Sequence, residues 1–161
     1  MEAISEQRLA LVHPKVAAYV RGAHDALIAA GHPGFRVVQG LRTYAQQHAL
    51  YMQSRTIPPT GPWATNADQG YGNHNFGFAV DCMPFVEGDA GAIDINDVKA
   101  PEFVAMVAAL KAQGLAWGGD WPGKQGDFDH VQLADIPLTP TDADRAAYAS
   151  GGLAAVWALY E

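Results

Sequence analysis

Apolar residues recur with helical spacing in four parts of the chain. They predict helices over residues 14–31, 43–52, 101–114 and 141–161. Pro14 suits the first position of a helix, and Thr43 can cap the N-terminus of the second one. We expect the last helix to break at Gly151–Gly152, where two glycines interrupt an Ala-rich run.

Shorter runs rich in β-branched and aromatic residues predict strands. They cover residues 35–39, 76–83, 115–117 and 128–133. Helices dominate the first part of the chain, and strands separated by one helix follow. This order is typical of an α+β fold, so we expect a small antiparallel sheet flanked by helices.

Long loops separate these elements, over residues 54–73, 87–97 and 118–126. Loops longer than about 12–15 residues are usually functional or disordered. Two of the loops precede His74 and His130, so we expect them to frame a cleft. The third contains Asp89, Asp94 and Asp97, which predict either a solvated acidic loop or a site for a second cation such as calcium.

The length of 161 residues suits a single domain, residues 1–161. Ten Lys and Arg against 17 Asp and Glu give a formal net charge of −7. Nucleic acids and anionic membranes select clustered Lys and Arg, so we expect no nucleic acid or membrane partner. The N-terminus lacks a signal-peptide pattern, and no apolar run approaches a transmembrane span. We expect a monomer that is made in the cytoplasm.

The chain has one cysteine and six histidines. A lone Cys82 excludes an intrachain disulfide and a Cys-rich zinc site. Any metal site would therefore use histidine nitrogens and carboxylate oxygens. Cys82 itself is expected to be a small buried apolar residue.

A candidate metal site lies around the predicted strand 76–83. With a period of two, Ala79 and Asp81 share a face with Gly77, while the aromatic residues of the strand face the core. The small residues leave open space beside the carboxylate, and His74 lies just ahead of the strand. This layout favours a metal. The alternatives are a histidine with a structural role and a small-residue face that accommodates a helix.

His130 is the best candidate for a third ligand, because catalytic zinc takes three protein ligands and leaves a position open. Asp127 precedes it by three residues, and a carboxylate there could accept and return a proton. Asp129 should point away from His130 if the strand has already begun. The alternative is that both aspartates are turn residues.

The motif His-x-x-Gly-x-Ala-x-Asp, which begins at His74, resembles the signature of the LAS-type zinc peptidases of the M15 group. Three further segments agree in order with that family: 38–47 with its Arg and Gln, Thr65-Asn66-Ala67, and Trp117-Gly118-Gly119-Asp120-Trp121 followed by Asp127-x-x-His130. The resemblance spans residues 36–133. It implies a fold like that of the hedgehog and D-Ala-D-Ala peptidase proteins.

The resemblance implies that zinc is held by His74, Asp81 and His130. It also implies that Asp127 is the catalytic base and acid. Arg42 is then the cation that holds or polarises the substrate, although the residue alone would equally suit a structural ion pair.

Two further residues become candidate substrate contacts through the resemblance. They are Tyr44 and Gln47, and Gln47 either touches the substrate or braces Arg42. The family usually has Ser two positions before the first histidine, whereas this chain has Gly72.

We therefore expect a zinc-dependent hydrolase of peptidoglycan stem peptides, most similar to phage endolysin L-alanyl-D-glutamate endopeptidases. The alternatives are a D-Ala-D-Ala carboxypeptidase or dipeptidase, and a non-catalytic zinc-bearing wall-binding domain. The partner is a muropeptide substrate. We expect action at the cell wall or periplasm, after release by a holin and without a separate wall-binding domain.

Overall fold

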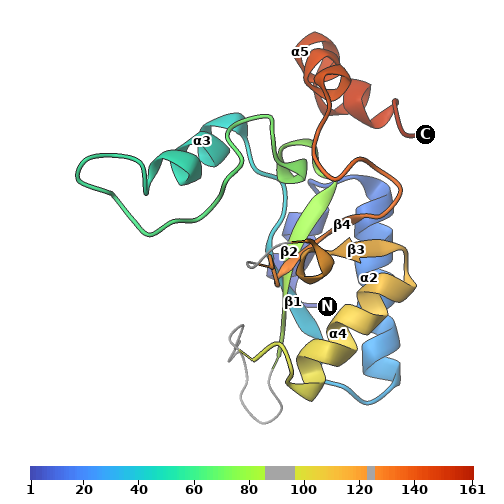
Figure 1. Cartoon of the computed structure of the whole chain (residues 1–161). Coiled ribbons are helices and arrows are strands. Elements are labelled where there is room, and N and C mark those ends of the chain that lie inside the picture. Colours follow the sequence, from blue (N-terminus) through green and yellow to red (C-terminus); the bar gives the residue numbers. More distant parts are fainter. Residues whose placement is uncertain (86–96, 123–125) are drawn as a thin grey trace.

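The computed structural model describes residues 1–85, 97–122 and 126–161. The acidic loop proposed for a second cation lies outside these residues, apart from Asp97. The elements of the described residues, shown in Figure 1, are α1 (Ala3–Leu9), α2 (Pro14–Ala29), β1 (Phe35–Gln39), α3 (Tyr44–Met52), the 3₁₀ helix η1 (Asn73–Phe76), β2 (Ala79–Pro84), α4 (Pro101–Ala112), β3 (Leu115–Trp117), the 3₁₀ helix η2 (Gly118–Asp120), β4 (His130–Leu133) and α5 (Asp142–Trp157).

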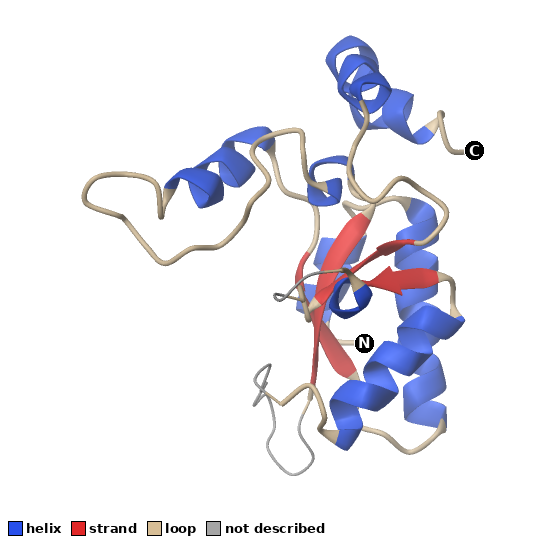
Figure 2. Ribbon diagram, in the orientation of Figure 1, coloured by secondary structure: helices blue, strands red, loops and turns tan. Residues whose placement is uncertain are grey.

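Four antiparallel strands form one sheet in the order β1-β2-β4-β3. Helices α2 and α4 lie side by side against it (Figure 2). The predicted α+β fold with a small antiparallel sheet is confirmed. The predicted helices are confirmed as well, with Thr43 capping α3 and a kink at Gly151–Gly152 in α5.

The apolar core lies between the sheet and the helices α2 and α4. It includes Val20 of α2 and Phe103 of α4, which pack with Val37 of β1 and Cys82 of β2, all of them fully buried. Burial of this apolar surface is the main force that holds the layers together. The predicted burial of Cys82 is thereby confirmed.

Alternation along β4 gives its two faces different tasks. Val131 and Leu133 belong to the apolar core, while His130 and Gln132 lie on the other face and are also buried. In register, His130 pairs directly with Asp81 of β2. Such cross-strand partners have Cβ atoms about 4.5–5.5 Å apart, so the sheet itself brings the imidazole and the carboxylate together.

Helix α1, which the sequence analysis did not predict, covers the edge strand β1. Ser5 Oγ accepts a hydrogen bond from the Val37 backbone N–H at 3.0 Å, and Arg8 donates to the Val37 carbonyl at 2.6 Å. These side chains satisfy edge groups that would otherwise be open to pairing with another strand.

Strand β2 begins three residues later than predicted. Residues 73–76 form η1, and Gly77 follows in the left-handed conformation with φ of 71°. This conformation is easy only for glycine, and it turns the chain sharply before the strand can start at Ala79. Phe76 and Phe78 are still buried, but Gly77 does not share a strand face with Asp81.

Strand β4 is also shorter than predicted and starts at His130 instead of residue 128. The His130 N–H bonds to the carbonyl of Asp127 at 3.3 Å, so the preceding residues form a turn. Phe128 in this turn is largely exposed. A turn lets Asp127 approach His130, which a strand would not.

Two peripheral elements lie on either side of η1. Helix α3 and the loop after it project away from the sheet (Figure 1), and Gln47 is the one buried residue of that helix. On the other side, Tyr148 of α5 stacks on Tyr44 with centroids 4.8 Å apart and packs edge-on against Phe76.

Among the described residues, no helix is long and apolar enough to cross a membrane.

The turn at Gly77 predicts a measurable stability difference between two glycine substitutions. A Cβ at Gly77 would lie 3.1 Å from Val12 Cα, whereas Gly31, with φ of 82°, has nothing within 4 Å of that position. Gly31→Ala should cost about 1–2 kcal/mol through backbone strain alone. Gly77→Ala should cost roughly 1–3 kcal/mol more, because backbone must also move. Urea unfolding of both variants measures this, and equal costs would contradict the crowding at Gly77.

Candidate active site

Three buried side chains converge above the sheet. His74 comes from η1, Asp81 from β2 and His130 from β4. His74 Nε2 lies 3.0 Å from Asp81 Oδ1 and 3.1 Å from His130 Nδ1, and His130 Nδ1 lies 3.5 Å from the same Oδ1. In the part of the chain that the structure describes, this is the one such cluster of His, Cys, Asp and Glu that could hold a metal ion.

The spacing of these three atoms fits zinc. Tetrahedral zinc with ligands at about 2.0–2.1 Å places neighbouring ligand atoms roughly 3.3 Å apart. The three separations of 3.0, 3.1 and 3.5 Å bracket that value. Two imidazoles and one carboxylate are a donor set that catalytic zinc uses. The predicted ligand residues are therefore brought together with suitable geometry.

Each imidazole turns its other nitrogen toward an oxygen. His74 Nδ1 lies 2.9 Å from the Gly40 carbonyl oxygen, and His130 Nε2 lies 3.2 Å from Gln132 Oε1. Hydrogen bonds of this kind orient metal-binding histidines and fix their tautomers. Gln132 was not among the residues predicted from the sequence, although its place two residues after His130 on one strand puts both on the same face.

The pKa values of the two histidines in the cluster are shifted in opposite directions. Burial lowers the pKa of His74, because its charged form loses solvation. For His130 the same burial is outweighed by the hydrogen bond and charge of Asp81, so its pKa is raised. Burial alone would raise the pKa of Asp81, but the charges and hydrogen bonds of the histidines hold it well below its usual range.

Arg42 contacts the cluster through the second oxygen of Asp81. Its NH2 donates to Asp81 Oδ2 at 2.7 Å, and the side chain is 17% exposed. Its backbone is tied to η1 as well, because the Arg42 N–H bonds to the His74 carbonyl. Arg42 thus forms an ion pair and also lines the cleft, so both interpretations from the sequence describe part of its surroundings.

Gln47 has a bracing position behind Arg42. It is 1% exposed, its Oε1 lies 3.5 Å from Arg42 NH1, and its Nε2 donates to the Ala67 carbonyl at 2.7 Å. The amide thereby links α3 to the loop with Thr65 and Ala67. Tyr44, the other predicted substrate contact, packs between Tyr148 and Phe76 and is not among the residues that line the cleft.

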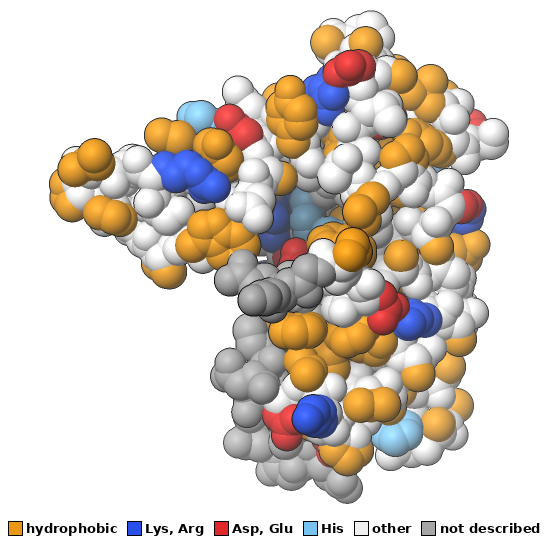
Figure 3. All heavy atoms as spheres, viewed as in Figure 1, with side chains coloured by type: hydrophobic (Ala, Val, Ile, Leu, Met, Phe, Trp, Pro, Cys, Tyr) orange, Lys and Arg blue, Asp and Glu red, His pale blue; other side chains and the backbone are white. Residues whose placement is uncertain are grey.

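A cleft of about 320 Å³ opens beside the cluster, and Figure 3 shows the hollow with histidine and basic side chains at its floor. One wall consists of residues 63–67 and the other of Trp121, Asp127 and residues 138–139. Trp121 also packs on the His130 ring, with centroids 4.9 Å apart. The loops that precede the two histidines do frame the cleft, as predicted.

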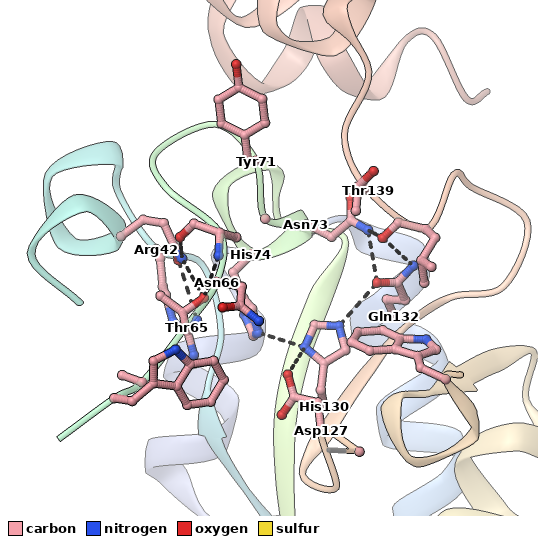
Figure 4. A pocket seen from close by; sticks show the side chains of 18 residues that line it. Arg42, Thr65, Asn66, Tyr71, Asn73, His74, Asp127, His130, Gln132 and Thr139 are labelled. Carbon is pink, nitrogen blue, oxygen red and sulfur yellow. Dashed lines mark hydrogen bonds and ion pairs between the residues drawn. The ribbon is translucent and has the colours of Figure 1, made fainter. Parts of the chain in front are cut away.

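Asp127 faces the cleft beside the cluster (Figure 4). Its side chain is 54% exposed, and its Oδ2 lies 3.9 Å from His130 Nδ1. Gly118 permits this position, because a Cβ there would overlap the Asp127 carbonyl oxygen. The glycine in the Trp-Gly-Gly motif is therefore required by close backbone approach, as well as by resemblance.

The carboxyl group of Asp129 lies beside that of Asp127. This group hydrogen bonds with Asp127, and burial together with the charge of Asp81 raises its pKa to about 7. The prediction that Asp129 points away from His130 applied to a strand that has begun before His130, whereas β4 begins at His130 itself.

A buried His/Asp/His cluster beside an open cleft with a half-exposed carboxylate defines the class of zinc hydrolases. The comparisons agree. A family model described as D-alanyl-D-alanine carboxypeptidase matches residues 65–133, which contain all three cluster residues. The peptidoglycan L-alanyl-D-glutamate endopeptidase CwlK of Bacillus subtilis is 33% identical over an alignment of 117 positions, and the match covers 68% of this chain and 68% of that protein.

Two solved structures share the fold. The L-Ala D-Glu endopeptidase ChiX of Serratia marcescens matches with a TM-score of 0.55 and 27% identity, covering 83% of this chain and 88% of that one. The vancomycin resistance D,D-pentapeptidase VanY, solved in complex with Zn(II), matches with a TM-score of 0.54 and 18% identity, covering 78% and 74%. The chain belongs to the M15 family of zinc peptidases, so it is a zinc-dependent metallopeptidase.

The opposite pKa shifts of His74 and His130 predict how the two residues titrate in the metal-free protein. His130 should titrate above its ordinary pKa of about 6.5, and His74 below it. The raised pKa means that His130 stabilises the metal-free fold below about pH 6.5 and that this contribution is lost as the pH rises through the folded-state value. Protonated His130 cannot bind a metal, so zinc affinity should fall as the pH is lowered. NMR titration of the ring protons measures both values, and indistinguishable curves would contradict the opposite shifts.

Gly118→Ala should displace Asp127 and leave the cluster intact. The new methyl group meets rigid backbone, so the loop has to move away. Peptide hydrolysis should fall while zinc content stays at the wild-type value. Gly61→Ala is the control, because its Cβ would make an ordinary 3.4 Å contact with Gln53 far from Asp127. Wild-type turnover in Gly118→Ala would show that close approach of this loop is not needed.

Proposed function

We propose that this protein is an L-alanyl-D-glutamate endopeptidase that cleaves the stem peptides of peptidoglycan. Two of the similar proteins, CwlK and ChiX, have that activity in their names. The observation that carries the proposal is the half-exposed Asp127 carboxylate, which faces the cleft 3.9 Å from a nitrogen of the metal cluster. A non-catalytic zinc domain would have no need for a carboxylate there.

We assign the metal to His74 Nε2, Asp81 Oδ1 and His130 Nδ1, the three atoms that meet at suitable separations. When bound, zinc supplies Lewis-acid chemistry and lowers the pKa of a coordinated water to about 7. Arg42 holds the other oxygen of Asp81 at 2.7 Å, which leaves Oδ1 free to face the metal. Arg42 is thus a positioning residue as well as a cation in the cleft.

Asp127 is the proposed general base and acid. Its Oδ2 accepts a proton from the attacking water and returns it to the nitrogen of the departing amine, in the manner of a carboxylate placed beside a reacting centre. Asp129, whose pKa is raised to about 7, hydrogen bonds with Asp127 and keeps this carboxyl group in place. Arg42 offers positive charge where negative charge develops on the carbonyl oxygen.

The second candidate function is removal of the terminal D-alanine by a D-Ala-D-Ala carboxypeptidase. It is favoured by the description of the matching family model. Within the endopeptidase proposal we further propose a role as an endolysin that acts at the cell wall. The charge of −7 supports binding through the cleft itself, because clustered basic residues for the wall polymer are absent from the sequence.

Digestion of a defined muropeptide by the zinc-loaded protein tests these assignments. Cleavage of the L-Ala–D-Glu bond leaves muramoyl-L-Ala and a peptide with D-Glu at its new N-terminus, whereas a carboxypeptidase releases free D-alanine. Mass spectrometry distinguishes the products. A chelator should abolish cleavage and added zinc should restore it. Release of D-alanine alone would contradict the endopeptidase assignment.

Asp127→Ala should lower kcat by about 10²–10⁴-fold, which is typical for loss of a general acid–base group. Its zinc content should stay unchanged. Asp120→Ala is a matched control, because Asp120 has the same 54% side-chain exposure but pairs with Lys111 on the surface. Asp120→Ala should keep wild-type activity. Full activity in Asp127→Ala would remove Asp127 from the catalytic role.

A further inference from the structure

A buried hydrogen-bond chain runs from the loop before α5 to the ring of His130. Its two side chains are Asn73, the residue before His74, and Gln132 of β4, and they are 5% and 2% exposed. Figure 4 shows them side by side between His130 and Thr139. Neither touches the other two residues of the metal cluster through its side chain in the described contacts. Their arrangement therefore calls for a role of its own.

This chain of hydrogen bonds starts at two backbone carbonyl groups, which can only accept hydrogen bonds. Asn73 Nδ2 lies 3.0 Å from the Leu138 carbonyl oxygen and 3.3 Å from the Pro137 carbonyl oxygen. Carbonyl oxygens only accept hydrogen bonds, so the NH₂ group of Asn73 has to face them. If the amide were reversed, its own oxygen would meet two carbonyl oxygens in a buried site, which is costly.

Asn73 in turn fixes the orientation of the Gln132 amide group. The same Asn73 Nδ2 donates to Gln132 Oε1 at 2.9 Å, and Gln132 Nε2 lies 3.5 Å from the Leu138 carbonyl oxygen. Both contacts turn the Gln132 oxygen toward Asn73 and its NH₂ toward the carbonyl. The oxygen that remains facing His130 can therefore act only as an acceptor.

The contact between Gln132 and His130 fixes the tautomer of the imidazole ring. Gln132 Oε1 lies 3.2 Å from His130 Nε2, so that nitrogen has to carry a proton and donate it. In the neutral ring the lone pair is then on Nδ1, which faces His74 and Asp81. His74 reaches the same condition more directly, since its Nδ1 faces the Gly40 carbonyl at 2.9 Å and its Nε2 faces the cluster.

We propose that Gln132, oriented by Asn73, is a positioning residue that fixes His130 as the Nε2–H tautomer and so makes Nδ1 a ligand for the metal. The proposal rests on the proposed assignment of His130 to the metal site. In this proposal the carbonyl groups of residues 137 and 138 fix which atoms donate and which accept along the hydrogen-bond chain. The loop before α5 thereby contributes to metal affinity without touching the metal.

The test begins with the zinc-loaded wild-type protein labelled with ¹⁵N. NMR should find the His130 ring proton on Nε2 and slowly exchanging, with no proton on Nδ1. A proton on Nδ1 would overturn the proposal. This measurement needs no variant, so it tests the tautomer even where a substitution prevents folding.

Two substitutions then separate positioning from packing. Gln132→Met has a similar shape without the acceptor oxygen, and it should weaken zinc binding by about 10–100-fold, the usual effect of losing such a partner. It should also expose the Nε2 proton to fast exchange. Gln132→Glu keeps an acceptor oxygen and should retain the Nε2 proton, with zinc binding stronger than in Gln132→Met. Wild-type zinc affinity in Gln132→Met would overturn the proposal.

Gln47→Met is the matched control, because Gln47 is an equally buried glutamine at the same cleft that contacts Arg42 instead of His130. Gln47→Met should leave the His130 proton on Nε2 and slowly exchanging. Fast exchange of that proton in Gln47→Met as well would overturn a specific role for Gln132. His130→Ala tests the underlying assignment separately. Wild-type zinc affinity in His130→Ala would remove His130 from the metal site, a failure distinct from any result with Gln132.

Discussion

The carboxylate of Asp81 is the interaction on which the rest of the site depends. One oxygen lies 3.0 and 3.5 Å from nitrogens of His74 and His130, and the other accepts from Arg42 at 2.7 Å. A buried carboxylate is costly unless its charge is balanced and its oxygens are hydrogen bonded. Three separate segments of the chain meet this demand together. Without Asp81, two imidazoles and a guanidinium would face one another with only the half-exposed Asp127 beside His130 as a counter-charge.

The fold delivers these groups by simple means. Antiparallel pairing places Asp81 opposite His130, and the turn at Gly77 brings His74 back over the same face. Helix α5 packs its Tyr148 against Phe76 of η1 and thereby supports the histidine from behind. The projecting α3 is held by the buried amide of Gln47 and by Tyr44, which stacks on Tyr148 and packs edge-on against Phe76.

Much of this could be predicted from the sequence, because strand alternation and helix signals are local. The helices, the small sheet and the set of cluster residues follow from such patterns and from the resemblance. The strand starts were predicted wrongly, because turns ahead of two strands are not marked by the alternation of apolar residues. Contact with Val12 and a left-handed turn at Gly77 make β2 begin at Ala79, and a turn before His130 shortens β4. Tyr44 stacks on Tyr148, and its contact with substrate stays a prediction from the motif. Helix α1 had no strong local signal.

A crystal structure of the zinc-loaded protein, with anomalous diffraction measured at the zinc absorption edge, tests the account most directly. The account predicts one ion about 2.0–2.2 Å from each of three atoms, His74 Nε2, Asp81 Oδ1 and His130 Nδ1, with a fourth position open to the cleft beside Asp127. An ion bound elsewhere, or held through Nε2 of His130, would contradict it.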